Sequence, residues 1–205
     1  MKTVRKTLIL AACAIMLVCA TIAGTLAYLT DTKYVTNTFT VGNVGITLNE
    51  AAVDPDGTYV TDVNNRTNSN GYHLLPGHSY IKDPKITVSE GSEDCYLFVK
   101  VENGLKGAED TSTIASQMAS NRWVQVKGNV NVYVYATLKD GKTVPTVVTA
   151  NDEVPVFDSF TISGNVDGEA LLAYAKAEIK VTAYAIQADG FDGKTVDEIW
   201  AAVNE

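Results

Sequence analysis

The sequence has few of the residues from which disulfide frameworks and thiol sites are built. It contains three cysteines in 205 residues, and Cys13 and Cys19 lie in an apolar N-terminal run. If that run is removed, Cys95 is the only thiol left, which excludes an intramolecular disulfide. The segment around Cys95 has the composition of a strand, so we expect a buried thiol. The domain must then be held together by its hydrophobic core.

Histidine is equally scarce, and His73 and His78 do not form a known zinc motif. Neither is followed by glutamate, as in the His-Glu-x-x-His helix, and a catalytic zinc site needs three protein ligands. The pair is therefore a weak metal candidate, and solvated loop histidines are the simpler interpretation. The Asp-Gly segments 54–57 and 189–193 cluster oxygens but lack the EF-hand pattern, which favours turns. We expect no catalytic residue and no cofactor.

Basic side chains are also in short supply. The chain carries 16 Lys and Arg against 24 Asp and Glu, a net charge of −8, and three of the basic residues lie in the first six positions. Nucleic acids and anionic membranes attract proteins that present a basic surface. The composition therefore argues against both ligands, and it is typical of a soluble extracellular protein without stable membrane insertion.

The N-terminus has the three-part layout of a secretory signal peptide. A basic start is followed by an apolar run from residue 8 to 23, and then by small residues at Thr25 and Ala27. Cleavage between Ala27 and Tyr28 is predicted, which makes residues 1–27 a leader. The protein is then expected outside the cell, in the extracellular matrix or at the cell surface.

Two other outcomes at the N-terminus are disfavoured. The first is a retained membrane anchor. The apolar run is only just long enough to span a bilayer, and the small residues that follow it form a cleavage pattern, which favours removal. Residues 10–13 resemble a lipobox, but acylation of Cys13 would leave the apolar residues 14–18 where a polar tether is expected.

Alternation of apolar and polar residues predicts strands through most of the remaining chain. The expected strands are 80–89, 95–101, 123–127, 130–138, 144–148, 154–162 and 179–186. Short helices are expected at 112–120 and 167–177, and a capping box at 195–198 predicts a C-terminal helix. A polar loop without core residues is expected at 64–71. Many short strands and no βαβ rhythm predict one mainly β domain, a single antiparallel sandwich with short peripheral helices.

The domain is expected to begin after a change of strand parity. Val35, Phe39 and Val41 share one parity, and the apolar positions shift by one after residues 42–43, as a bulge would produce. Residues 28–43 are therefore assigned to an N-terminal arm and 44–205 to the sandwich. The side chains expected to turn inward are Phe39, Val44, Ile46, Leu48, Phe98, Val132, Val134, Ile179, Val181 and Ala183.

Three segments resemble the TasA/camelysin family of exported Gram-positive proteins, which a SipW-type signal peptidase processes. The first joins residues 23–31 to the Asn-x-Phe-x-x-Gly entry at 37–44. The second is the Leu-Pro-Gly turn at 75–77 with the following Lys-Asp at 82–83, and the third is the strand 179–187. Residues 104–175 show no such match.

The resemblance implies a jelly-roll-like sandwich and a structural role in biofilm matrix fibres. In such fibres the N-terminal strand of one subunit adds to the next subunit, and here Val35, Phe39 and Val41 would occupy alternate pockets. The partners would be other copies of the chain or other matrix proteins. A mobile arm, or an ordinary first strand in its own sheet, is the simpler alternative.

Two further functions remain open. Camelysin-like members are classed as metallopeptidases, so the resemblance also implies a secreted or surface metalloendopeptidase, although no zinc motif is present. An extracellular carbohydrate- or protein-binding module would need exposed aromatic side chains. Tyr133 and Tyr135 share one face of a strand, and core or cross-strand packing explains them as well.

The leader assignment predicts the N-terminus of the secreted protein. Sequencing should find Tyr28, within one or two residues, because Thr25 and Ala27 are the small pair nearest the end of the apolar run. A mature chain that begins at an acylated Cys13, or an intact leader in the membrane fraction, would contradict this prediction.

Overall fold

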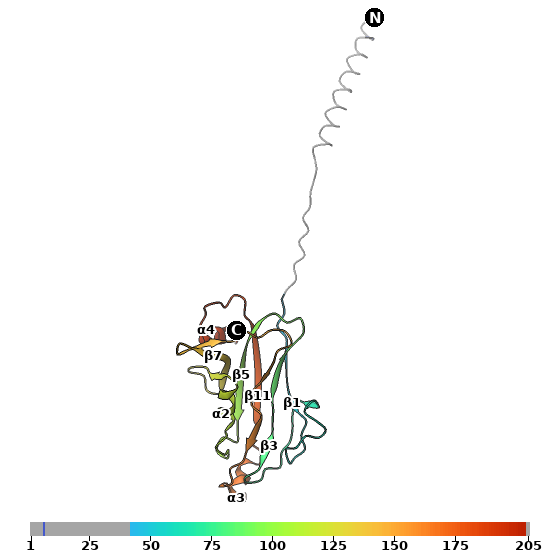
Figure 1. Cartoon of the computed structure of the whole chain (residues 1–205), viewed down its shortest axis with the longest axis vertical. Helices are drawn as coiled ribbons and strands as arrows, with labels where there is room; N and C mark the ends of the chain where they lie inside the picture. The colour runs from blue at the N-terminus through green and yellow to red at the C-terminus, as the bar shows by residue number, and fades with distance from the viewer. Residues whose placement is uncertain (1–5, 7–41, 204–205) are drawn as a thin grey trace. The chain divides into compact units, whose positions relative to one another are not determined.

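The computed structural model describes residue 6 and residues 42–203. From Gly42 onward the chain forms one compact unit, in which antiparallel strands build two facing sheets with short helices at the periphery (Figure 1). The predicted mainly β, antiparallel sandwich is confirmed. Within the described part of the chain, no helix has the length and apolar character needed to cross a bilayer.

The first sheet has the strand order β2-β1-β4-β9, and a two-stranded ribbon, β10-β3, extends it. Every pairing in it is antiparallel. Its strands are β1 (Ile46–Ala51), β2 (Arg66–Thr67), β3 (Ser79–Ile81), β4 (Lys85–Val88), β9 (Glu153–Pro155) and β10 (Ser159–Thr161).

Two strands that the sequence predicts as continuous, 80–89 and 154–162, are each broken in the middle. Pro84 lacks an N–H and cannot complete the ladder. The breaks lie opposite each other: Lys82 N donates to Asp158 O at 3.2 Å, and Val156 N donates to Pro84 O at 2.9 Å. The two segments therefore stay hydrogen-bonded to each other through the bend, where both change direction.

The second sheet has the order β11-β5-β7-β6, and β8 pairs with β7. β11 pairs with β5 along its whole length, with Ala183 opposite Val99. Its strands are β5 (Cys95–Asn103), β6 (Trp123–Gln125), β7 (Val132–Lys139), β8 (Lys142–Pro145) and β11 (Ile179–Gln187).

The predicted helices form, with shorter bounds. They are α2 (Ile114–Ser120), α3 (Gly168–Leu171), the 3₁₀ turn η1 (Leu172–Tyr174) and α4 (Val196–Val203). The capping box that opens α4 is reciprocal: Thr195 N donates to Glu198 Oε2 at 2.8 Å, and Glu198 N donates to Thr195 Oγ1 at 3.3 Å. These bonds satisfy N–H groups that have no partner inside the helix.

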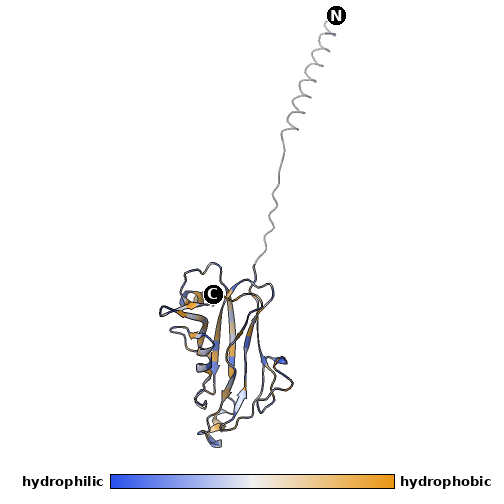
Figure 2. Cartoon of the chain, viewed as in Figure 1, coloured by the Kyte–Doolittle hydropathy of each residue, from blue (hydrophilic) through white to orange (hydrophobic). Residues whose placement is uncertain are grey.

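The main core fills the space between the sheets. Ile86 and Val88 of β4 and Leu97 and Val99 of β5 are fully buried there. Apolar and polar residues alternate along β4, as a strand with differing faces requires, and Figure 2 shows the hydropathy of the strands. Val44, Ile46 and Leu48, and Ile179, Val181 and Ala183, pack against this core but are only half-buried. Phe39, also expected here, lies outside the described residues.

A second core covers the opposite face of the second sheet, and it corrects the expectation of one inward set. Phe98, Val132 and Val134 are buried, but they face α4 rather than the first sheet. Trp200 of α4 contacts Phe98 and Tyr184, with ring centroids 5.3 Å away from each. The sheet thus has an apolar layer on both faces, because successive side chains of β5 point to opposite sides.

Replacement of Phe98 by alanine should destabilise the domain. Phe98 has no exposed surface, and truncation of a buried phenylalanine usually costs about 3–5 kcal/mol of unfolding free energy. Chemical denaturation measures this, with Leu138→Ala as the control because Leu138 is 66% exposed. Equal stability of Phe98→Ala and the parent protein would show that this residue is not in the core.

Candidate functional site

Among the described strands, one edge of the sandwich is left open between β1 and β11. In the described chain, β11 has a strand partner on one side only, which is β5. β1 pairs with β4 along one side, and on the other side β2 covers only Glu50 and Ala51. β1 and β11 face each other across this edge. An edge strand presents unpaired N–H and C=O groups, so this side of the domain can accept another strand.

Burial along β11 shows what is missing at this edge. Val99 and Val101 of β5 are buried, whereas Val181 and Ala183, which pair with them, are only half-buried. Both strands direct these side chains into the same core, so the difference arises because no further described strand lies beside β11. A further strand here would remove the apolar surface of β11 from water.

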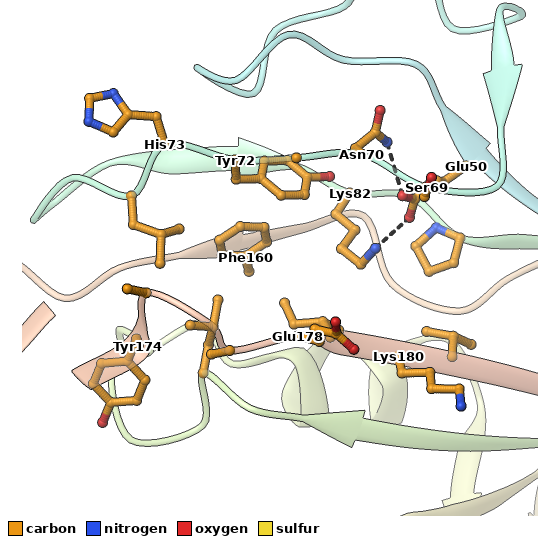
Figure 3. A pocket seen from close by; sticks show the side chains of 18 of the residues that line it. Glu50, Ser69, Asn70, Tyr72, His73, Lys82, Phe160, Tyr174, Glu178 and Lys180 are labelled. Carbon is orange, nitrogen blue, oxygen red and sulfur yellow. Dashed lines mark hydrogen bonds and ion pairs between the residues drawn. The ribbon is translucent and has the colours of Figure 1, made fainter. Parts of the chain in front are cut away.

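A groove of about 910 Å³ lies along this edge. Figure 3 shows Tyr72, Phe160 and Lys82 on one side and Tyr174, Glu178 and Lys180 on the other. Much of the lining is apolar: Leu48, Tyr72, Leu74, Leu105, Phe160, Leu171, Tyr174, Ile179 and Val181. Tyr72 meets Phe160 edge to face, at 5.1 Å between ring centroids. A groove lined by apolar side chains and a few polar groups can bind a peptide segment.

A buried ion pair forms part of one wall. Lys82 Nζ lies 2.6 Å from Glu50 Oε2, and the two side chains are 10% and 7% exposed. Asn70 Nδ2 donates to the other carboxylate oxygen, Glu50 Oε1, at 2.9 Å. Buried charges are tolerated only when they are paired and hydrogen-bonded, and here both oxygens of Glu50 have a partner (Figure 3).

Arg66 fastens the neighbouring loop to the sheet. Its guanidinium bonds Asp83 Oδ2 at 2.6 Å and the Asp83 carbonyl at 3.0 Å, and it also reaches the carbonyl of Asn49 at 2.8 Å. Asp83 Oδ1 accepts from Ala51 N at 2.6 Å. The planar, five-donor guanidinium suits this arrangement, which a lysine could not reproduce. The wall of the groove is thereby fixed to β1 and to the bend at Pro84.

These contacts correct two expectations. Residues 64–71 were expected to be a polar loop without core residues, yet they contain β2 and supply Arg66 and Asn70 to the partly buried network. Lys82 and Asp83 were expected inside a continuous strand, 80–89, but they lie between β3 and β4. The charged pair at 82–83, inside a segment predicted to be a strand, was the available signal for part of this network. Their partners are distant in sequence, so periodicity could not identify them.

The two histidines lie beside the turn at 54–57 rather than in a metal site. His73 N donates to the carbonyl of Pro55, and His78 Nε2 lies 2.9 Å from the carbonyl oxygen of Asp56. Among the residues that the structure describes, no group of three or more His, Cys, Asp or Glu side chains is placed to hold a metal ion.

The remaining candidate residues have structural surroundings. Hydrogen bonds from the backbone and hydroxyl of Thr58 hold the pKa of Asp54 below its ordinary value, so this carboxylate closes a turn. Burial, with the nearby Asp94, raises the pKa of Cys95 to about 11, as expected for an inert thiol. Tyr133 and Tyr135 pack against the main core, which leaves less of either ring to bind a sugar.

The cleavage and assembly residues predicted from sequence are all N-terminal to the described domain. Ala27 and Tyr28 at the expected cleavage site, and Val35, Phe39 and Val41 in the arm, lie outside the described residues. The domain itself contributes the groove, which sequence reasoning did not locate. Comparison with protein families, with curated proteins and with solved structures gave no match for this chain.

Removal of the Arg66 guanidinium should destabilise the groove wall. Arg66→Ala leaves the 19%-exposed Asp83 side chain without its cation, and loss of hydrogen bonds to a charged group costs roughly 1.5–3 kcal/mol of unfolding free energy. Lys85→Ala is the matched control, because its partner Glu153 is 55% exposed, and such a pair contributes less than about 1 kcal/mol. Equal losses in the two variants, measured by chemical denaturation, would contradict the assignment.

Proposed function

We propose that this protein is an exported structural subunit that assembles into extracellular fibres by strand addition. The observation that carries the proposal is the open edge between β1 and β11, with half-buried apolar side chains along it. The proposed donor is the segment 28–41 within the N-terminal arm of another copy, once the leader has been removed. The chain acts as a building block and not as an enzyme, with itself or another matrix protein as partner and with a SipW-type signal peptidase acting during export.

The chemistry of the groove supports an extended peptide as its occupant. Strand addition derives affinity from backbone hydrogen bonds to an edge strand, and specificity from pockets for alternate side chains. β11 supplies a nine-residue edge, and the groove at its start has apolar seats at Leu48, Ile179 and Val181. Both requirements are met on the same side of the domain.

The composition of the arm is compatible with this role. Residues 28–41 outnumber the nine residues of β11 and contain no proline, so the segment can supply a full-length ladder. Val35, Phe39 and Val41 share one parity, and in an extended strand such residues project from one face. They would fill the apolar seats, while the intervening threonines would face outward.

Variants of the arm test donation. Truncation through Asn37 should give soluble monomers, because it removes Val35 and much of the donor backbone. A proline at Thr36 or Thr38 should also weaken assembly, because proline lacks a ladder donor and fixes φ. Size-exclusion chromatography and electron microscopy of the mature protein measure the outcome. The same fibres from truncated protein would rule out donation by this arm.

A variant of the groove tests acceptance. Val181→Asp places a charge where the donor should bury apolar side chains, and it should prevent assembly while the arm stays intact. Val144→Asp is the matched control, since Val144 is 44% exposed on β8. Mixing Val181→Asp with the truncated chain should give heterodimers only, as one has a donor and the other an acceptor. Normal fibres from Val181→Asp would exclude this groove as the acceptor.

A further inference from the structure

Three side chains at the end of the groove meet in an arrangement that the assembly proposal does not use. Glu50 binds Lys82 Nζ through Oε2, at 2.6 Å, and Asn70 Nδ2 through Oε1, at 2.9 Å. One carboxylate therefore holds an amine and a carboxamide at its two adjacent oxygens. Glu50 is 5% exposed and Lys82 is 9% exposed, and Asn70 is half-buried beside them.

The carboxamide of Asn70 is also held in a polarised state. Its Oδ1 accepts from Val53 N at 3.0 Å, while its Nδ2 donates to the carbonyl of Ala51 at 2.8 Å as well as to Glu50. A backbone N–H on an amide oxygen stabilises the negative charge that develops there when a nucleophile adds to the carbon. A lysine amine is a competent nucleophile once it has lost its proton.

We propose that Lys82 and Asn70 join covalently through an isopeptide bond, with Glu50 as the proton carrier. Lys82 Nζ gives a proton to Glu50 and then adds to Asn70 Cγ, forming the new C–N bond and a tetrahedral intermediate. Its oxyanion faces Val53 N. Glu50 returns this proton to Nδ2 and takes up the second proton that Nζ must lose. The Cγ–Nδ2 bond then breaks, and the departing ammonia receives the second proton from Glu50 and leaves as ammonium. No oxidant, metal or cofactor takes part, and the carboxylate is regenerated.

The burial of Glu50 and Lys82 favours the first proton transfer. Two separated charges are costly away from water, and transfer of the proton from Nζ to Oε2 removes both at once. The carboxylate already touches the atom that must lose a proton and the atom that must gain one, so a single residue serves as base and then acid. Nζ and Nδ2 are bound to the two oxygens of one carboxylate, which holds the amine close to the carboxamide that it must attack.

The bond would close a loop from residue 70 to 82 that carries Tyr72 and Leu74, two apolar residues of the groove wall. In a domain without an intramolecular disulfide, it would supply a covalent tie that reducing agents do not break. The proposal concerns the folded domain alone and is independent of whether the chain forms fibres.

Intact-mass measurement tests the bond directly. Purified protein, kept folded overnight at neutral pH and then denatured, should weigh about 17 Da less than its sequence, which is the mass of the lost ammonia. Trypsin should fail to cut after Lys82, and further digestion with chymotrypsin should release a branched peptide that joins the two segments. A full mass for the folded wild-type protein would overturn the proposal.

Two variants separate this bond from other losses of ammonia. Asn70 precedes Gly71, so a succinimide at Asn70 would give the same mass change. Lys82→Arg keeps a cation beside Glu50 but has no nucleophilic amine; it should show the full mass, and a persistent loss would mean a succinimide and overturn the proposal. Glu50→Gln should slow or abolish the loss, whereas Glu153→Gln, at an exposed ion pair, should retain it.

Discussion

The rest of the domain depends on one constraint, which is that β5 is apolar on both faces. Leu97 and Val99 point toward the first sheet, while Tyr96 and Phe98 point toward α4. Each face must be covered, because exposed apolar surface of this extent is unfavourable in water. A sheet on one side and a helix on the other meet this requirement. The neighbours of β5 in the sheet, β7 and β11, are then aligned by antiparallel pairing over several residues.

The same constraint applies to β11, which pairs with β5 at one edge of the second sheet. β11 continues the apolar layer of β5 toward the first sheet, but it is the last strand of its sheet in the described domain. Natural edge strands are usually protected by charges, bulges or covering loops. Here Lys180 is exposed, yet its neighbours Ile179 and Val181 line a groove. Lys180 therefore protects this edge only in part.

The groove has a wall in which the buried charges of Glu50 and Lys82 are paired with each other. In the part of the chain that the structure describes, every buried side-chain nitrogen or oxygen has a hydrogen-bond partner. Burial, together with the charge of Glu50, raises the pKa of Tyr72, so its hydroxyl remains a neutral donor to the carbonyl of Ile81. A wall held by Arg66 and by the Glu50–Lys82 pair keeps its shape when empty, which reduces the ordering that a bound peptide would otherwise require.

Features with a local cause could be predicted from the sequence. The turn at 54–57 needs only Asp54 and a glycine with positive φ, and Gly57 has φ of 79°. The start of α4 needs only Thr195 and Glu198. The candidate site was less accessible: the apolar parity of β11 was visible, but neither its position at an edge nor the groove beside it could be read from periodicity. Phe98 was correctly assigned to a core, but to the wrong face, because alternation does not reveal whether the second face is covered.

The sequence by itself determined the mainly β class, the approximate strands of the second sheet and the capped C-terminal helix. These follow from alternation, turn residues and capping, all of which act over a few neighbouring residues. Only the tertiary structure decided that Glu50, Asn70 and Lys82 meet, that the two long strands break opposite each other beside Pro84, and that β11 has an open side. The physical reason is that these features arise from pairing between segments far apart in the chain, and sheet order and burial are properties of that pairing rather than of any one segment.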